Sequence, residues 1–136
     1  MKPSCLRPSE SGEVYFHEGC HILEMLNDPA HPELSIARAR VRPGVRTRRH
    51  RLRETSEHYV LQAGTGRMFL GDDPEGHPVR AGDVVVIPAG VDQAILNTGA
   101  GDLVFLALCH PRFVPEAYED TDPRPAGEPR EEGVSR

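Results

Sequence analysis

The chain has 136 residues, a formal net charge of −5 at pH 7 and 38% hydrophobic residues. This length is typical of a single domain with its own core. The negative net charge excludes a general electrostatic attraction to nucleic acids or acidic membranes. The longest apolar run, residues 103–109, is too short to span a bilayer. We therefore expect a cytoplasmic protein with neither nucleic acid nor membrane as a partner.

Both ends of the chain differ in composition from its middle. Residues 1–12 are polar and contain Pro and Ser, which predicts a flexible arm. Residues 119–136 are rich in Pro, Glu and Arg and have almost no large apolar side chains. Such a segment buries too little surface to offset its chain entropy, so we expect a disordered tail. The folded domain is then residues 13–118.

Short stretches with a period of two fill the middle of the chain. Residues 34–42, ELSIARARV, place three arginines on one face and small or apolar residues on the other, which is the alternation of a strand. Residues 57–71 are typical of a strand, a turn with glycine and a second strand. Further short strands follow at 83–90, 92–97 and 102–111. Many short strands with frequent turn signals predict an all-β sandwich or barrel.

Two spaced motifs lie within these strands. The first, G-x5-H-x-L-x4-E-x6-G, runs from residue 44 to residue 64, and the second, G-x5-P-x-G-x2-Q-x3-N, runs from residue 82 to residue 97. The pair resembles the two motifs of the cupin superfamily, over about residues 35–112. Only Leu52 and Gln93 depart from the family pattern, which typically has histidines there. The resemblance implies one jelly-roll β-barrel.

The resemblance also implies a metal site. Metal-binding cupins use two histidines and a glutamate from the first motif and a histidine from the second. Carried over by position, His50, Glu57 and Gln93 become the candidate ligands, whereas Leu52 has no donor atom. Such nitrogen and oxygen donors suit a divalent Zn, Mn, Fe or Ni ion. The alternative is a metal-free cavity in which His50 and Glu57 hydrogen-bond to each other and Gln93 caps the pair.

Strand alternation predicts which side chains accompany these ligands. It places Arg46, Arg48 and Leu52 on the face of His50, and Tyr59 on the face of Glu57. Because paired guanidinium hydrogen bonds recognise carboxylates and phosphates, we expect a small, anionic ligand that contacts Arg46, Arg48, Leu52 and Tyr59. Tyr59 is an acid–base candidate or a core residue. The arginines are otherwise solvated strand faces or the rim of a dimer.

Two functions follow from the resemblance. One is a metal-dependent enzyme in which Glu57 and Tyr59 are catalytic, with an isomerase, epimerase or lyase favoured over a dioxygenase. The other is a metal-free binding or sensing barrel without catalysis, which Leu52 favours because it makes the cavity wall more apolar. Val60 and Leu96 are expected on the outer surface, where they predict a homodimer.

Overall fold

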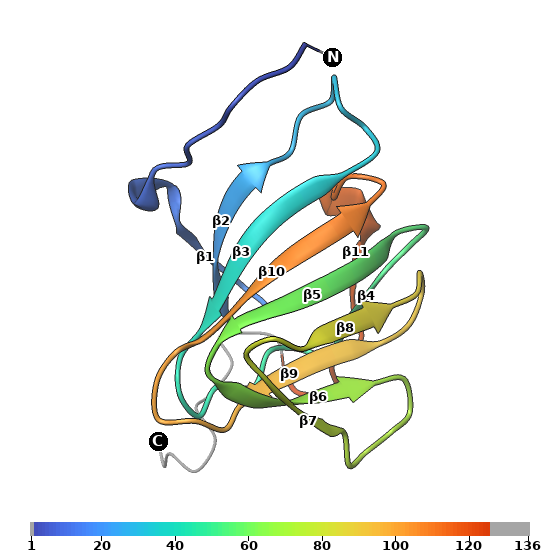
Figure 1. The fold of residues 1–136 in the computed structure, drawn as a ribbon. Coiled ribbons are helices and arrows are strands. Elements are labelled where there is room, and N and C mark those ends of the chain that lie inside the picture. The colour runs from blue at the N-terminus through green and yellow to red at the C-terminus, as the bar shows by residue number, and fades with distance from the viewer. Residues whose placement is uncertain (1, 126–136) are drawn as a thin grey trace.

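The computed structural model describes residues 2–125, which form two antiparallel sheets around a common core (Figure 1). One sheet has six strands in the order β1-β2-β3-β10-β5-β8, and the other has five in the order β11-β4-β9-β6-β7. The expected all-β jelly-roll barrel is therefore confirmed. Within residues 2–125, no helix has the length and apolar character needed to cross a membrane. The elements are η1 (Glu10–Gly12), β1 (Val14–Phe16), β2 (Cys20–Leu26), β3 (Ser35–Val41), β4 (His50–Leu52), β5 (Ser56–Ala63), β6 (Thr65–Leu70), β7 (His77–Arg80), β8 (Val84–Ile87), β9 (Gln93–Asn97), β10 (Leu103–His110), η2 (Pro115–Ala117) and β11 (Tyr118–Asp120).

Alternating residues of the strands build the core between the sheets. On β5, Glu57, Tyr59 and Leu61 are buried, whereas His58 and Val60 between them are only partly buried. The same alternation runs along β10, which lies between β3 and β5 in the six-stranded sheet. Because successive strand side chains point to opposite faces, the period of two correctly predicted which residues of β3 and β5 face inward.

Two glycines of the motifs occupy tight turns. Gly64 joins β5 to β6 with a φ of +87°, and Gly90 follows β8 with a φ of +79°. Side chains rarely tolerate such backbone angles. At Gly64 space is limiting too, because a Cβ atom would lie 2.7 Å from the carbonyl oxygen of Asp102. The motif spacing thus places glycine where the turn requires it.

Acidic residues near the N-terminus pair with arginines of β3. Glu10 accepts hydrogen bonds from both terminal nitrogens of Arg38, at 2.8 and 2.6 Å. Glu13 accepts two more from Arg40, at 2.7 and 3.2 Å. Partly exposed ion pairs stabilise a fold only modestly, but these hold η1 beside the sheet. The last part of the arm expected at residues 1–12 is therefore ordered.

The C-terminal boundary differs from the expected one. Where a disordered tail was expected from residue 119 on, the chain forms β11, which pairs antiparallel with β4 and sets Asp120 opposite His50. The physical reason is a long-range ion pair, in which Nε of Arg48 donates to Asp120 at 2.7 Å. Composition does not reveal such a partner. Residues 126–136, the remainder of the expected tail, lie outside the described residues.

Candidate functional site

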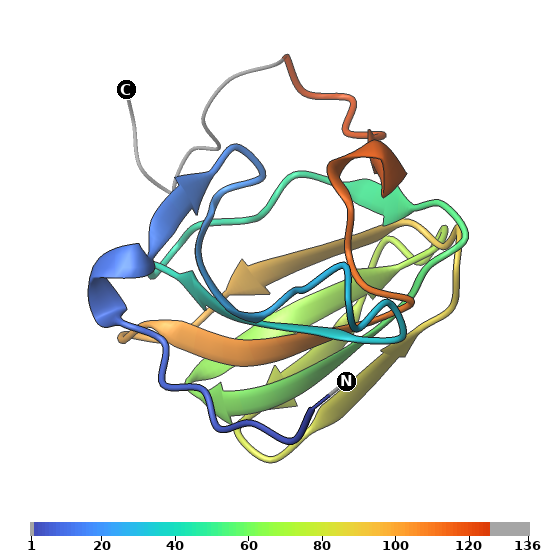
Figure 2. The same ribbon diagram turned by 90° about the horizontal axis from the view of Figure 1, so that it is seen from above.

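A cavity of about 80 Å³ lies inside the barrel, with room for several water molecules or a small organic ligand. Strands β1 to β5 and β10 form most of its wall, and the C-terminal segment after β10 completes the wall with Phe113 and Tyr118. Figure 2 shows this segment, in red, and β1, in blue, at the same side of the barrel. The ionisable side chains with nitrogen or oxygen atoms that line the cavity are Glu18, Glu24, His50, Glu57, Tyr59 and Tyr118.

Glu57 is a buried carboxyl group at the start of β5. Burial raises its pKa from an ordinary 4.5 to about 7, partly opposed by the nearby His50 and reinforced by the charge of Glu18. Its Oε1 accepts a hydrogen bond from the amide nitrogen of Gln93 at 2.9 Å, and Sγ of Cys109 donates to its Oε2 at 3.7 Å. A carboxyl group with a pKa near neutrality can both release and accept a proton.

Gln93 joins Glu57 to Tyr59. The Tyr59 hydroxyl donates to the amide oxygen of Gln93 at 2.5 Å, and the Tyr59 ring stacks on Phe105 at 4.1 Å between centroids. Burial raises the pKa of Tyr59 far above its usual value, so its hydroxyl stays protonated. Tyr59 therefore fills the core with its ring, which is one of the two roles expected for it, and orients Gln93 with its hydroxyl in place of the expected acid–base role.

His50 pairs with Glu18, a residue that the sequence motifs do not include. Its Nδ1 donates to the carbonyl oxygen of Arg48 at 2.8 Å, and its Nε2 lies 3.1 Å from Oε2 of Glu18. Two lone pairs would repel at this distance, so one proton lies between the two groups. The direct His50–Glu57 hydrogen bond expected for a metal-free cavity is thus replaced by the pair of His50 with Glu18.

Glu18 reaches the cavity from the turn between β1 and β2, where Gly19 adopts a φ of +108°. Tyr118 reaches it from the first residue of β11 and stacks on His50, with 5.0 Å between the ring centroids. Neither belongs to a spaced motif. An acidic residue directly before a glycine is the only local signal for Glu18, and it is too common to identify a site.

The expected metal ligands do not form a suitable donor set in this arrangement. Gln93 presents its amide nitrogen, a donor, toward Glu57, while its oxygen accepts from Tyr59. A metal ligand must instead offer a lone pair to the ion. In the described part of the chain, no group of three or more His, Cys, Asp and Glu side chains is placed to hold a metal ion. We therefore derive no chemical step through a metal at His50, Glu57 and Gln93.

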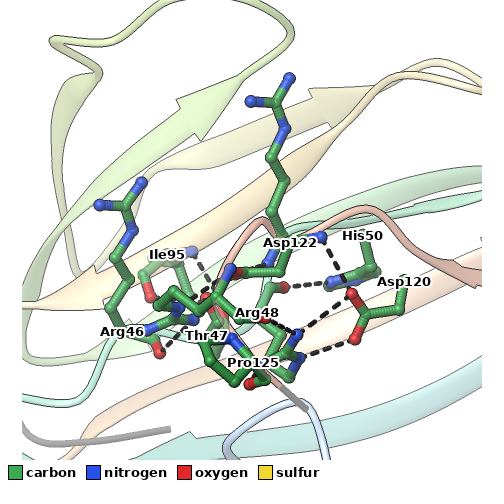
Figure 3. A network of polar contacts seen from close by, with 10 residues as sticks. Arg46, Thr47, Arg48, His50, Ile95, Asp120, Asp122 and Pro125 are labelled. Carbon is green, nitrogen blue, oxygen red and sulfur yellow. Dashed lines mark hydrogen bonds and ion pairs between the residues drawn. The ribbon is translucent and has the colours of Figure 1, made fainter.

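The two arginines expected beside the ligand point elsewhere (Figure 3). Arg48 is 4% exposed and donates to Asp120 and to the carbonyl oxygens of Arg124 and Pro125. The Arg46 guanidinium lies 4.4 Å from the centre of the Phe69 ring. Strand alternation misplaced them because β4 begins only at His50, and Thr47, not its neighbours, lines the cavity.

The cavity is therefore acidic and apolar rather than basic. Three glutamates and one histidine line it, and none of its described lining residues is arginine or lysine. Leu52, at the position of the missing histidine, is 3% exposed and lines the cavity together with Phe16, Ile22 and Phe105. A carboxylate or phosphate ligand would meet like charges here without a cation to offset them, so this wall favours an uncharged ligand.

Residues 37–109 match the family described as the cupin domain. An uncharacterized protein from Methanocaldococcus jannaschii is 32% identical over 111 residues, which cover 77% of this chain and 82% of the relative. A predicted oxalate decarboxylase from Thermotoga maritima is 26% identical with a TM-score of 0.71, over 79% of this chain and 99% of the other. A Streptomyces PAC13 variant with uridine is 13% identical with a TM-score of 0.70, over 87% of this chain and 92% of the other.

Proposed function

Because the chain belongs to the cupin family, we propose that its barrel binds a small, uncharged hydroxy-carbonyl compound and that Glu57 exchanges a proton with it. The observation that carries this proposal is the buried Glu57 carboxyl group in the cavity wall, with a pKa of about 7. Such tuning is typical of groups that act as both acid and base near neutral pH.

The side chains around Glu57 supply the remaining parts of a proton transfer. In its ionised form, Glu57 removes a proton from the carbon beside the ligand carbonyl, and the electron pair of that bond moves to the carbonyl oxygen. This oxygen takes the proton held between His50 and Glu18. Glu57 then gives its proton to the former carbonyl carbon, and the hydroxyl on the carbon that was first deprotonated gives its proton to the His50–Glu18 pair. The product is an isomer, and no oxidant is needed.

Gln93 and Tyr59 act on this step through Glu57. The Gln93 amide donates to Glu57 and so stabilises its ionised form, against the effect of burial. Tyr59 keeps the amide in the orientation in which nitrogen, not oxygen, faces Glu57. We assign both as positioning residues, and Glu57 as the group that touches the reacting carbon.

The charge of the cavity wall supports an uncharged substrate. The lining holds three glutamates, and its described residues include neither arginine nor lysine. The structure of a Streptomyces PAC13 variant contains uridine, an uncharged molecule, in a similar fold. The name of the Thermotoga maritima relative indicates lyase chemistry on a dicarboxylate. That chemistry lacks an arginine or lysine partner in this cavity, so we place it second.

A bound divalent metal is a second candidate, and it would require Gln93 to turn its amide oxygen toward the site and His50 Nε2 to leave Glu18. The observation in its favour is the tautomer of His50, because donation from Nδ1 to a backbone carbonyl is typical of histidines that bind metals through Nε2. Elemental analysis tests it directly. One equivalent of Zn, Mn, Fe or Ni, absent from both His50→Ala and Glu57→Ala, would support this candidate. Protein that stays metal-free after incubation with these salts would contradict it.

The proton transfer itself is tested by exchange with solvent. The protein is incubated in D2O with dihydroxyacetone, glyceraldehyde and erythrulose, and deuterium at the carbon beside each carbonyl is followed by NMR. We expect exchange above the background with at least one compound, and a loss of about 100-fold or more in Glu57→Gln. The matched control is Glu75→Gln, an exposed glutamate outside the cavity.

Two results would overturn this assignment. Equal exchange in wild type and Glu57→Gln would remove Glu57 from the reaction. Binding of a compound without exchange would instead support the alternative function, a binding or sensing barrel without catalysis.

A further inference from the structure

The C-terminal strap, residues 118–125, carries an aromatic residue into the cavity wall. We propose that the Tyr118 hydroxyl donates a hydrogen bond to the ligand, so that the strap forms part of the binding site. This inference rests on the proposed small-molecule function, but it requires no catalysis. It gives a role to a residue outside both cupin motifs.

The Tyr118 hydroxyl is an unsatisfied donor. Its oxygen atom is buried and has no hydrogen-bond partner among residues 2–125. Buried polar groups nearly always have a partner, either in the protein or in a bound molecule. Since the residue lines the cavity, a molecule in that cavity is the natural partner.

The aromatic neighbours of Tyr118 fix its ring beside the proton-carrying pair. The ring stacks on His50 with an interplanar angle of 22°, and it makes edge contacts with Phe16 and His17 at 5.3 and 5.2 Å between centroids. A tyrosine hydroxyl ordinarily keeps its proton near neutral pH, so it is available as a donor.

The strap is held in place without help from this hydroxyl. The backbone of β11 pairs with β4, and Arg48 binds Asp120 (Figure 3). Next along the strap, Thr121 donates to Asp92 at 2.8 Å, and the Asp122 carboxylate accepts from the backbone nitrogen of Arg49 at 2.7 Å. Because these contacts position the strap, the Tyr118 hydroxyl is free to serve the ligand alone.

The donor groups of the cavity wall indicate which kind of ligand atom they contact. A tyrosine hydroxyl that donates requires an acceptor, and the carbonyl or hydroxyl oxygen of an uncharged compound provides one. The proton between His50 and Glu18 lies beside the same ring. Both groups thus contact one oxygen-bearing end of the ligand, while Leu52, Phe16 and Phe105 contact its carbon atoms.

The test compares Tyr118→Phe with the wild-type protein in full-length form. Binding of dihydroxyacetone, glyceraldehyde and erythrulose is measured by NMR titration, and Tm is measured without ligand. We expect the dissociation constant of the bound compound to rise about two- to tenfold, the usual effect of one lost hydrogen bond. The Tm should stay equal or rise, because the hydroxyl has no partner within the described protein.

The outcomes separate this inference from the proposed function. An unchanged dissociation constant in Tyr118→Phe would overturn the inference, even if Glu57→Gln abolishes exchange. A fall in Tm together with unchanged binding would also overturn it and assign the hydroxyl a structural role. Weaker binding in Tyr118→Phe without exchange in the wild type would sustain the inference and defeat the catalytic proposal. Failure of the wild type to bind any of the three compounds would overturn both.

Discussion

The polar residues on two sides of the cavity differ in how far the sequence predicts them. The motif side consists of His50 and Glu57, which line the cavity from β4 and β5, and of Gln93 on β9, which donates a hydrogen bond to Glu57. The second side consists of Glu18, in the turn after β1, and Tyr118, on β11, and both contact His50. The motif side is set by spacing within the two motifs, whereas the second side is brought in by contacts between distant parts of the chain.

The difference explains how a barrel with an incomplete set of cupin histidines retains a polar centre. Leu52 and Gln93 remove two expected metal donors from the motif side. Glu18 supplies a partner for His50, and Gln93 becomes a bridge between Glu57 and Tyr59. The motif side therefore presents a carboxyl group of raised pKa, and the second side contributes Glu18, which shares a proton with His50.

The largest expected effect concerns the buried carboxyl group of the motif side. The pKa of Glu57 is raised from about 4.5 to about 7 in the folded protein. Between these values the unfolded chain loses its proton while the folded protein keeps it, so stability falls as pH rises through this window and levels off above it. The total loss is on the order of 3 kcal/mol.

Urea denaturation between pH 4 and pH 8 measures this loss. In Glu57→Gln the fall across the window should be smaller by about that amount, and the variant should be more stable than wild type at pH 8. Glu75→Gln serves as the control and should follow the wild type. If wild type and Glu57→Gln show the same pH dependence, the raised pKa of Glu57 is wrong.

The second effect concerns the anchor of the strap, which carries Tyr118 of the second side. Replacing Arg48 by methionine removes the side-chain donor of two backbone carbonyl oxygens and leaves the Asp120 carboxylate with the backbone nitrogen of Asp122 as its donor. Because Asp120 is partly exposed and can regain water, we expect a loss of about 1–3 kcal/mol in the free energy of unfolding. Hydrogen exchange should also become faster at the β11 amides than at those of β5.

The matched control for Arg48 is Arg80→Met, which removes an exposed arginine of β7. Urea denaturation compares the two variants. A loss in Arg48→Met no greater than in Arg80→Met would show that the strap does not depend on this ion pair. Contacts other than the Arg48–Asp120 pair would then have to hold β11 in place.

The smallest effect tests whether the two sides communicate. The charge of Glu18 contributes to the raised pKa of Glu57. In Glu18→Gln this charge is absent, so the pKa of Glu57 should fall, although burial, the larger cause, still holds it above 4.5. Titration of the Glu57 carboxyl carbon by NMR measures the shift. An unchanged pKa would mean that the two sides act independently.

Much of the motif side could be predicted from the sequence. The alternation in β5 placed Glu57 and Tyr59 on the inner face, and motif spacing identified the turns at Gly64 and Gly90. Arg46 and Arg48 were misplaced because alternation was extended into a segment before β4 that is not a regular strand. Tyr118 was assigned to the last position of the domain, since composition after it gave no sign of β11.

The sequence by itself thus determined the family, through the resemblance of its two motifs, together with the barrel and the inward residues of β3 and β5. The inward residues follow from the period of two and the motif turns from glycine, which a linear pattern expresses directly. Only the tertiary structure decided that Glu18 pairs with His50, that Arg48 holds the strap and that Tyr118 closes the cavity wall. These contacts join residues tens of positions apart, whose pairing depends on how the two sheets and the strap pack together.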